Sequence, residues 1–150
     1  MKLKMKVLVS LILSFLILYT GAMSLRSLHL NSLSESSQAA AQFLEEEGFN
    51  VMYHSGHYGP YFFDSLSIME DPHLNVWEVQ TVNPEPYFGM ELHNEFFKVN
   101  RHPLSSFFGL GPTSVVVMMS GNDIITAYSI KRGMIYSLYG ETREEVHREK

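Results

Sequence analysis

The feature that most constrains this chain is an apolar run from Val7 to about Met23, preceded by three lysines within the first six residues. Positive flanks resist translocation, so we expect the lysines to stay in the cytoplasm while the rest of the chain is exported. The basic start, the apolar stretch and the small residues at 20–22 fit a secretory signal peptide cleaved after Ala22. A membrane anchor is the alternative, because about 17 to 25 apolar residues span a bilayer. The predicted location is therefore the cell membrane with the C-terminal domain outside, or secretion if the segment is cleaved.

Three segments follow from this pattern. We interpret residues 1–23 as a signal peptide or membrane anchor and the serine-rich residues 24–34 as a linker. The remaining residues, 35–150, have the length of one domain and are predicted to be the exported domain. The chain has no cysteine, which excludes a disulfide framework, a thiolate metal site and a cysteine nucleophile.

Charge argues against nucleic acid as a partner. The whole chain carries 11 − 16 = −5, and without the three N-terminal lysines 8 − 16 = −8 remains. An acidic domain without a basic stripe repels phosphate backbones. The expected partners are the membrane, through the N-terminal segment, and an envelope protein or peptide.

One helix is predicted at the start of the domain. Ser32 and Glu35 have capping-box spacing, and Gly48 supplies a C-terminal stop. Between them an apolar stripe recurs at helical intervals. Its residues are Ala39, Ala40, Phe43 and Leu44.

Strands are predicted over most of the rest. The segments "FNVMYH", "NVWEVQTV", "NEFFKVN" and "MIYSLYG" have strand patterns, and "SVVVMMSGNDIITAYSI" is two strands around a tight turn. A short C-terminal helix follows Thr142. The fold class is therefore α+β, with one amphipathic helix packed on a mostly antiparallel sheet and a C-terminal β-meander. The expected core is Phe49, Val51, Trp77, Val79, Val115 and Val117 under Ala40, Phe43 and Leu44.

The stretch "HSGHYGPY" carries the strongest hint of chemistry, because it places His54 and His57 three apart. A zinc site needs three or four ligands, and this pair gives at most two. His73, His93 and His102 could complete a site only through the fold. We interpret the stretch as a glycine-rich turn and expect no metal and no cofactor.

Catalytic motifs are missing. G-x-S-x-G does not occur, and Gly109-Leu110-Gly111 is followed by proline rather than by a phosphate-binding sequence. Carboxylates such as Asp64, Glu78 and Glu91 could act as an acid and base pair in a glycosidase, but their required spacing of roughly 5 to 9.5 Å is spatial.

Aromatic residues in the glycine- and proline-rich connections form the predicted binding site. If at least three of them gather into one exposed patch, they would mark an interaction surface; alternatively the loops bury them in a satellite cluster. These residues are Tyr58, Tyr61, Tyr87, Phe88, Phe107 and Phe108.

The segments "AAAQFLEEEGFNV", "VWEVQTVNPEPYFGMEL", "EFFKVNRHPL" and "YSLYGETREEV", in this order, resemble small exported or membrane-anchored proteins of unknown function from Gram-positive bacilli. The resemblance implies an envelope location and a helix-then-sheet domain, and it assigns no functional residue. The function expected from the sequence is an extracytoplasmic module that binds a protein or peptide. The alternative is a cell-wall hydrolase that uses loop carboxylates or histidines.

Overall fold

The computed structural model describes residues 2–105 and 111–148 and divides the chain into two compact units, Met1–Leu33 and Ser34–Lys150. The first unit contains the helix α1, Lys2–Asn31. Among the residues that the structure describes, no helix combines the length and the apolar character needed to cross a membrane. The membrane anchor therefore stays a prediction.

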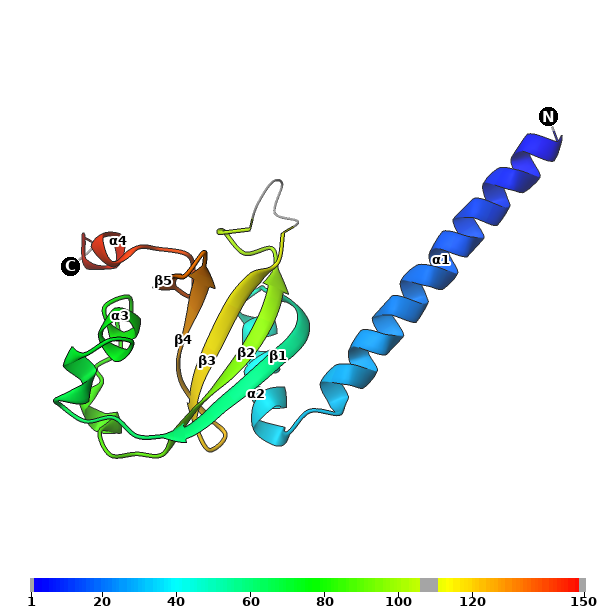
Figure 1. Ribbon diagram of the computed structural model, residues 1–150. Helices are drawn as coiled ribbons and strands as arrows, with labels where there is room; N and C mark the ends of the chain where they lie inside the picture. Colours follow the sequence, from blue (N-terminus) through cyan, green and yellow to red (C-terminus); the bar gives the residue numbers. More distant parts are fainter. Residues whose placement is uncertain (1, 106–110, 149–150) are drawn as a thin grey trace. The chain divides into compact units, whose positions relative to one another are not determined.

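The second unit is an α+β domain built on a five-stranded antiparallel sheet (Figure 1). The strands are adjacent in the order of the sequence, so the whole sheet is a meander. They are β1 (Asn50–Tyr61), β2 (Leu92–Asn100), β3 (Thr113–Ser120), β4 (Asp123–Lys131) and β5 (Met134–Ser137). The helical elements are α2 (Glu35–Glu46), η1 (Ser67–Met69), α3 (His73–Trp77), η2 (Glu85–Tyr87) and α4 (Arg143–Arg148). The predicted α+β class is confirmed.

The N-cap of α2 lies two residues later in the chain than predicted. Ser34, not Ser32, is the N-cap, and its hydroxyl oxygen accepts a hydrogen bond from the Ser37 backbone N–H at 3.2 Å. At the other end Gly48 has φ +90°, which a residue with a Cβ adopts only under strain. The glycine stop is therefore confirmed, while the predicted cap is corrected.

One face of the sheet packs against α2. Ala40 and Leu44 are fully buried there, because side chains at i and i+4 share one face of a helix. The odd-numbered residues of β2 pair with odd-numbered residues of β3, and their side chains point toward α2, since side chains alternate along a strand. The core residues predicted on this face that are buried are Ala40, Leu44, Phe49, Val51, Val115 and Val117, whereas Phe43 is half-buried.

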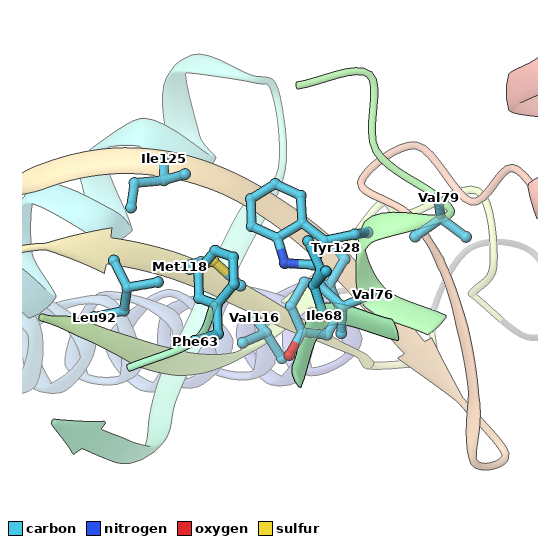
Figure 2. Close-up of a cluster of buried hydrophobic side chains, with 10 residues drawn as sticks. Phe63, Ile68, Val76, Val79, Leu92, Val116, Met118, Ile125 and Tyr128 are labelled. Atoms are coloured by element: carbon cyan, nitrogen blue, oxygen red, sulfur yellow. The ribbon is translucent and has the colours of Figure 1, made fainter. Parts of the chain in front are cut away.

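The opposite face is covered by the segment that contains η1, α3 and η2, and here the prediction was wrong. Trp77 and Val79 are not on a strand under α2: Trp77 ends α3, and both belong to a second cluster of buried side chains (Figure 2). The alternation in "NVWEVQTV" misled because Val76, Trp77 and Val79 also have the spacing of one buried helical face. Pro72, the N-cap of α3, favours this reading since proline suits the start of a helix.

The predicted turn "HSGHYGP" is wrong as well, because β1 continues through it to Tyr61. Register shifts against β2 absorb the irregular residues. Gly59 has φ +145°, and a Cβ at this position would lie 2.6 Å from the Cβ of His93. The glycine is therefore needed for the close approach of β1 to β2, not for a chain reversal.

The C-terminal third follows the sequence prediction. A tight turn at Gly121, which has φ +59°, joins β3 to β4, and a second turn leads into β5. Thr142 and Glu145 then form a capping interaction at α4, with the Thr142 N–H donating to Glu145 Oε2 over 2.7 Å.

Candidate functional site

A buried carboxylate surrounded by imidazoles lies between α2 and the sheet. Glu95, on β2, is 0% exposed. Ser37 reaches it from the first turn of α2, and His54 and His57 reach it from β1. His93 lies two residues before Glu95 on the same face of β2. We call these five residues the histidine–glutamate cluster.

Both oxygens of Glu95 are engaged. Oε2 accepts from Ser37 Oγ at 2.9 Å and from His54 Nε2 at 2.7 Å. Oε1 accepts from His57 Nδ1 at 2.8 Å. His93 Nε2 is 3.9 Å from Oε1, too far for a hydrogen bond. Ser36 Oγ also donates to Oε1, at 3.4 Å, so the carboxylate is held by four donors from α2 and β1.

These donors explain why a charge is tolerated inside the domain. Burial alone would raise the pKa of Glu95, but the hydrogen bonds from His57, Ser37 and His54 outweigh it and hold the pKa below its usual value. Burial lowers the pKa of His93, against the opposing attraction of Glu95. The cluster therefore favours an ionised Glu95 beside a neutral His93.

The hydrogen bonds also fix where the histidine protons lie. A carboxylate can only accept, so His54 carries a proton on Nε2 and His57 carries one on Nδ1. The His57 side chain is 48% exposed, so solvent reaches the histidine–glutamate cluster at this residue, whose Nε2 does not bond Glu95. His54 is mostly covered and packs its ring edge-on against Phe97, with centroids 5.1 Å apart.

The sequence raised the question whether His54 and His57 are half of a metal site. The structure brings these two residues and His93 together around Glu95, although it places them on strands rather than in a turn. Within residues 2–105 and 111–148, no group of three or more histidines, aspartates and glutamates is arranged to hold a metal ion. The short His–Glu distances are those of hydrogen bonds.

The other two candidate histidines are elsewhere. His102 is buried, where its Nε2 donates to the Leu138 carbonyl at 2.7 Å and its Nδ1 accepts from the Leu104 N–H at 3.0 Å. His73 stacks on Phe63, with ring centroids 5.9 Å apart.

The candidate acid–base carboxylates have local partners. Asp64 accepts from the backbone N–H groups of Leu66 and Ser67, and these bonds lower its pKa. Glu78 forms an ion pair with Arg143 at 2.8 Å. Glu91 is exposed. These contacts give the three residues no common site.

Sequence reasoning missed Glu95, although a signal was present. In "LHNEFFKVN", His93 and Glu95 alternate with the same period as Phe97 and Val99, which are completely buried. A carboxylate in register with a buried apolar face requires partners. His54 and His57 on the neighbouring strand supply them, but their pairing depends on the irregular register of β1.

A second feature is an apolar pocket of about 280 Å³ on the sheet face opposite α2. We call it the tyrosine recess. Its walls include Tyr58, Tyr61, Met118, Tyr128, Ile130 and Ile135.

Tyr58 and Tyr61 form one side of the tyrosine recess, with ring centroids 5.7 Å apart. Tyr58 is 62% exposed, whereas the Tyr61 hydroxyl turns inward and donates to Asn94 Oδ1 at 2.9 Å. Burial is the main cause of the raised pKa of Tyr61. The recess thus has one exposed aromatic edge, Tyr58, and one that a hydrogen bond holds in place, Tyr61.

Tyr128 lies in the buried cluster beside Met118 and Val116 (Figure 2), and it also lines the recess. Burial raises the pKa of Tyr128 to about 12. Within the described part of the chain its hydroxyl has no hydrogen-bond partner, yet it is not among the fully enclosed unpaired atoms. It therefore offers a polar contact inside an apolar recess.

The structure distributes the six predicted aromatic residues unevenly. Tyr58 and Tyr61 come together at the tyrosine recess. Tyr87 and Phe88 are half-buried and pack against the second cluster, where Tyr87 stacks on Trp77 with centroids 6.4 Å apart. The predicted residues Phe107 and Phe108 lie outside the described residues.

Neither a family model, nor a curated protein, nor a solved structure matches this chain.

Proposed function

We propose that this protein is an extracytoplasmic binding module that takes an apolar side chain of a partner protein or peptide into the tyrosine recess. The observation that carries the proposal is the Tyr128 hydroxyl, which has no hydrogen-bond partner in the described part of the chain and belongs to a residue that lines this mostly apolar pocket, together with the polar side chains of His73 and Asn94. Ligand pockets combine apolar walls with a few placed polar groups, which fix the orientation of the ligand.

The size and the rim of the recess support a side chain as the ligand. A volume of about 280 Å³ is near the lower end of the range for small-molecule pockets, and it suits one aromatic or branched aliphatic group. Tyr58 stands exposed at the rim. Tyrosine rings supply large contact areas at low entropic cost in binding surfaces.

The charge of the domain supports a neutral or basic partner. The unit Ser34–Lys150 carries 7 lysines and arginines against 16 acidic residues, and 7 − 16 = −9. A field of this sign slows the approach of anionic ligands and favours cationic ones.

The proposal can be tested with N-acetyl-L-phenylalaninamide as a probe, titrated into the full-length chain. Tyr128→Phe removes the hydroxyl and should weaken binding about threefold to tenfold, since one hydrogen bond contributes about 1 kcal/mol. Its stability should not fall, because the hydroxyl has no partner in the described part of the free protein. Ile135→Trp should fill the recess and abolish binding.

Tyr53→Ala is the matched control, because Tyr53 is also an exposed tyrosine of β1 but does not line the recess. It should bind the probe like the wild type. Equal binding by the wild type and Ile135→Trp would refute the proposal, as would an absence of binding at about 10 mM, a concentration well above the Kd expected of a specific pocket.

A hydrolase is the second candidate, and one observation favours it: the half-exposed His57 has its Nδ1 held by the buried Glu95. In such a pair the free Nε2 can take a proton from water while the carboxylate orients the ring. Release of fragments from purified Gram-positive cell wall that disappears in His57→Ala but persists in Tyr58→Ala would support it. Unchanged wall material would exclude this substrate.

We also propose that the domain is exported, because lysines precede the apolar run at the N-terminus. A reporter enzyme that is active only outside the cytoplasm, fused after Lys150, should be active. Replacing Leu11 and Leu13 by arginine should abolish this activity, since charges in the apolar run oppose insertion. An inactive wild-type fusion would contradict export.

A further inference from the structure

A second pocket, of about 430 Å³, adjoins the tyrosine recess. Ile135 of β5 lines both pockets, and α3 contributes a wall to each, with Val76 in the recess and Asn75 in the second pocket. The two pockets therefore share one side chain and one helix. We call the second one the β5–α4 pocket. Its lining also includes Glu78, Met134, Arg143 and Glu144.

Two contacts hold α4 beside the end of α3, so the β5–α4 pocket exists in the unbound protein (Figure 1). Arg143 Nη1 forms an ion pair with Glu78 Oε1 at 2.8 Å, and His147 Nε2 donates to the Glu78 backbone carbonyl at 2.9 Å. A side chain that enters this pocket needs no rearrangement of the two helices. Such preorganisation lowers the cost of binding.

The β5–α4 pocket is negatively charged. Its charged lining residues are Glu78, Glu144 and Arg143, which sum to 1 − 2 = −1. Arg143 engages Glu78. Glu144 is exposed and forms no ion pair with any residue that the structure describes. A positively charged group in this pocket would therefore find its partner at Glu144.

The same pocket also has an apolar wall. Met134 is exposed there, and Ile135 is half-buried. Lysine and arginine cover apolar surface with their methylene stems while the charged end stays in water. A basic side chain thus complements both parts of the lining, whereas an acidic one would be repelled by Glu144.

We propose that the partner segment bound at the tyrosine recess carries a lysine or arginine next to its apolar residue, and that this basic side chain lies in the β5–α4 pocket. Its stem packs on Met134, and its charge pairs with Glu144. Neighbouring residues suit two pockets that share the Ile135 side chain as a wall, because consecutive Cα atoms are only about 3.8 Å apart. This specificity rests on the function proposed above and adds a basic residue to the partner's sequence.

The test measures the affinity of four short peptides for the full-length chain. Acetyl-Phe-Arg-amide and acetyl-Arg-Phe-amide present the two residues in both orders. Each has a counterpart with citrulline, which keeps the shape of arginine and removes its charge. In at least one order the arginine peptide should bind about threefold more tightly than its counterpart, as expected of an exposed ion pair. Glu144→Gln should reduce this ratio to about one and leave the binding of N-acetyl-L-phenylalaninamide unchanged.

Glu91→Gln is the control, because it removes the same charge from an exposed glutamate that lines neither pocket. It should keep the preference for arginine. Equal binding of arginine and citrulline peptides in both orders, with N-acetyl-L-phenylalaninamide still bound, would overturn the basic residue and leave the tyrosine recess standing. An equal loss of preference in both glutamate variants would also overturn it, since the overall charge would then be the cause. If none of the five ligands binds, the function proposed above fails, and the basic residue fails with it.

Discussion

The imidazole of His57 donates from Nδ1 to Oε1 of Glu95 over 2.8 Å. The histidine side chain is half-exposed, whereas the carboxylate that it contacts has no solvent exposure. With His54 and Ser37 on the other oxygen, this contact joins β1, β2 and α2 at one point. Because both oxygens of the carboxylate already accept hydrogen bonds, we infer that its first role is structural: it holds α2 on the sheet.

This assignment predicts that Glu95→Gln destabilises the domain by about 2 to 3 kcal/mol. The amide replaces one acceptor by a donor, so at least one of the imidazole or hydroxyl donors loses its partner inside the protein. Urea unfolding followed by the fluorescence of the single tryptophan, Trp77, measures the change. Glu91→Gln is the control: Glu91 is exposed just before β2, and its substitution should cost less than about 0.5 kcal/mol. Similar values for the two variants would contradict the structural role of Glu95.

Acid should destabilise the cluster in two stages. Burial lowers the pKa of His93 from 6.5 in the folded protein. As the pH falls, the unfolded chain therefore binds a proton at His93 at a higher pH than the folded protein does. Stability is lost between pH 6.5 and the lower pKa of the folded state. The pKa of Glu95 is lowered from 4.5 by its hydrogen bonds, so its contribution is complete above 4.5 and is lost as the pH falls through the folded-state pKa.

The first stage can be isolated with His93→Gln. Between pH 7.5 and 5.5 the wild type should lose more unfolding free energy than this variant, because the variant lacks the group that protonates on unfolding. An equal or larger loss in the variant would show that His93 does not disfavour its proton in the folded state.

Gly59→Ala should destabilise the domain by more than about 2 kcal/mol, since the methyl group would clash with His93 at a backbone φ of +145° that alanine adopts poorly. Gly56 is the matched control on the same strand, because a Cβ there meets nothing within 4 Å. Gly56→Ala should stay within about 1 kcal/mol of the wild type. If both variants unfold at the same urea concentration, the close approach of β1 and β2 is not as described.

The proton positions give a spectroscopic prediction. In its neutral form His57 should be the Nδ1–H tautomer and His54 the Nε2–H tautomer, because each bonds a carboxylate through that nitrogen. Long-range nitrogen–proton correlation spectra distinguish the two forms. Finding His57 as the Nε2–H tautomer would exclude its hydrogen bond to Glu95 and with it the proposed hydrolase pair.

The sequence predicted those parts of the fold in which local and tertiary preferences agree. The turn at Gly121 and the capping pair Thr142 and Glu145 are local signals, and the structure contains both. The apolar stripe of α2 could also be predicted, because Ala40 and Leu44 recur at helical spacing. In "NVWEVQTV" the period was ambiguous over a short segment, and packing against the sheet decided for a helix.

The candidate site was harder to predict for a different reason. Glycine and proline in "HSGHYGP" are turn formers, yet β1 accommodates them by shifts in register, which are set by contacts with β2. These shifts decide which side chains of β1 face Glu95 and which face the tyrosine recess. Simple alternation already puts the adjacent residues His57 and Tyr58 on opposite faces, but it would also separate His54 from His57, which are three residues apart. The register shift between His54 and Gly56 brings both histidines to Glu95, and no local pattern encodes that shift.

The most direct test of binding at the tyrosine recess is to locate the probe N-acetyl-L-phenylalaninamide by intermolecular nuclear Overhauser effects. We expect contacts from its ring protons to the methyl groups of Met118, Ile130 and Ile135, which line the recess. Contacts to Ile125 and Leu138 instead, or none at a saturating concentration, would contradict it.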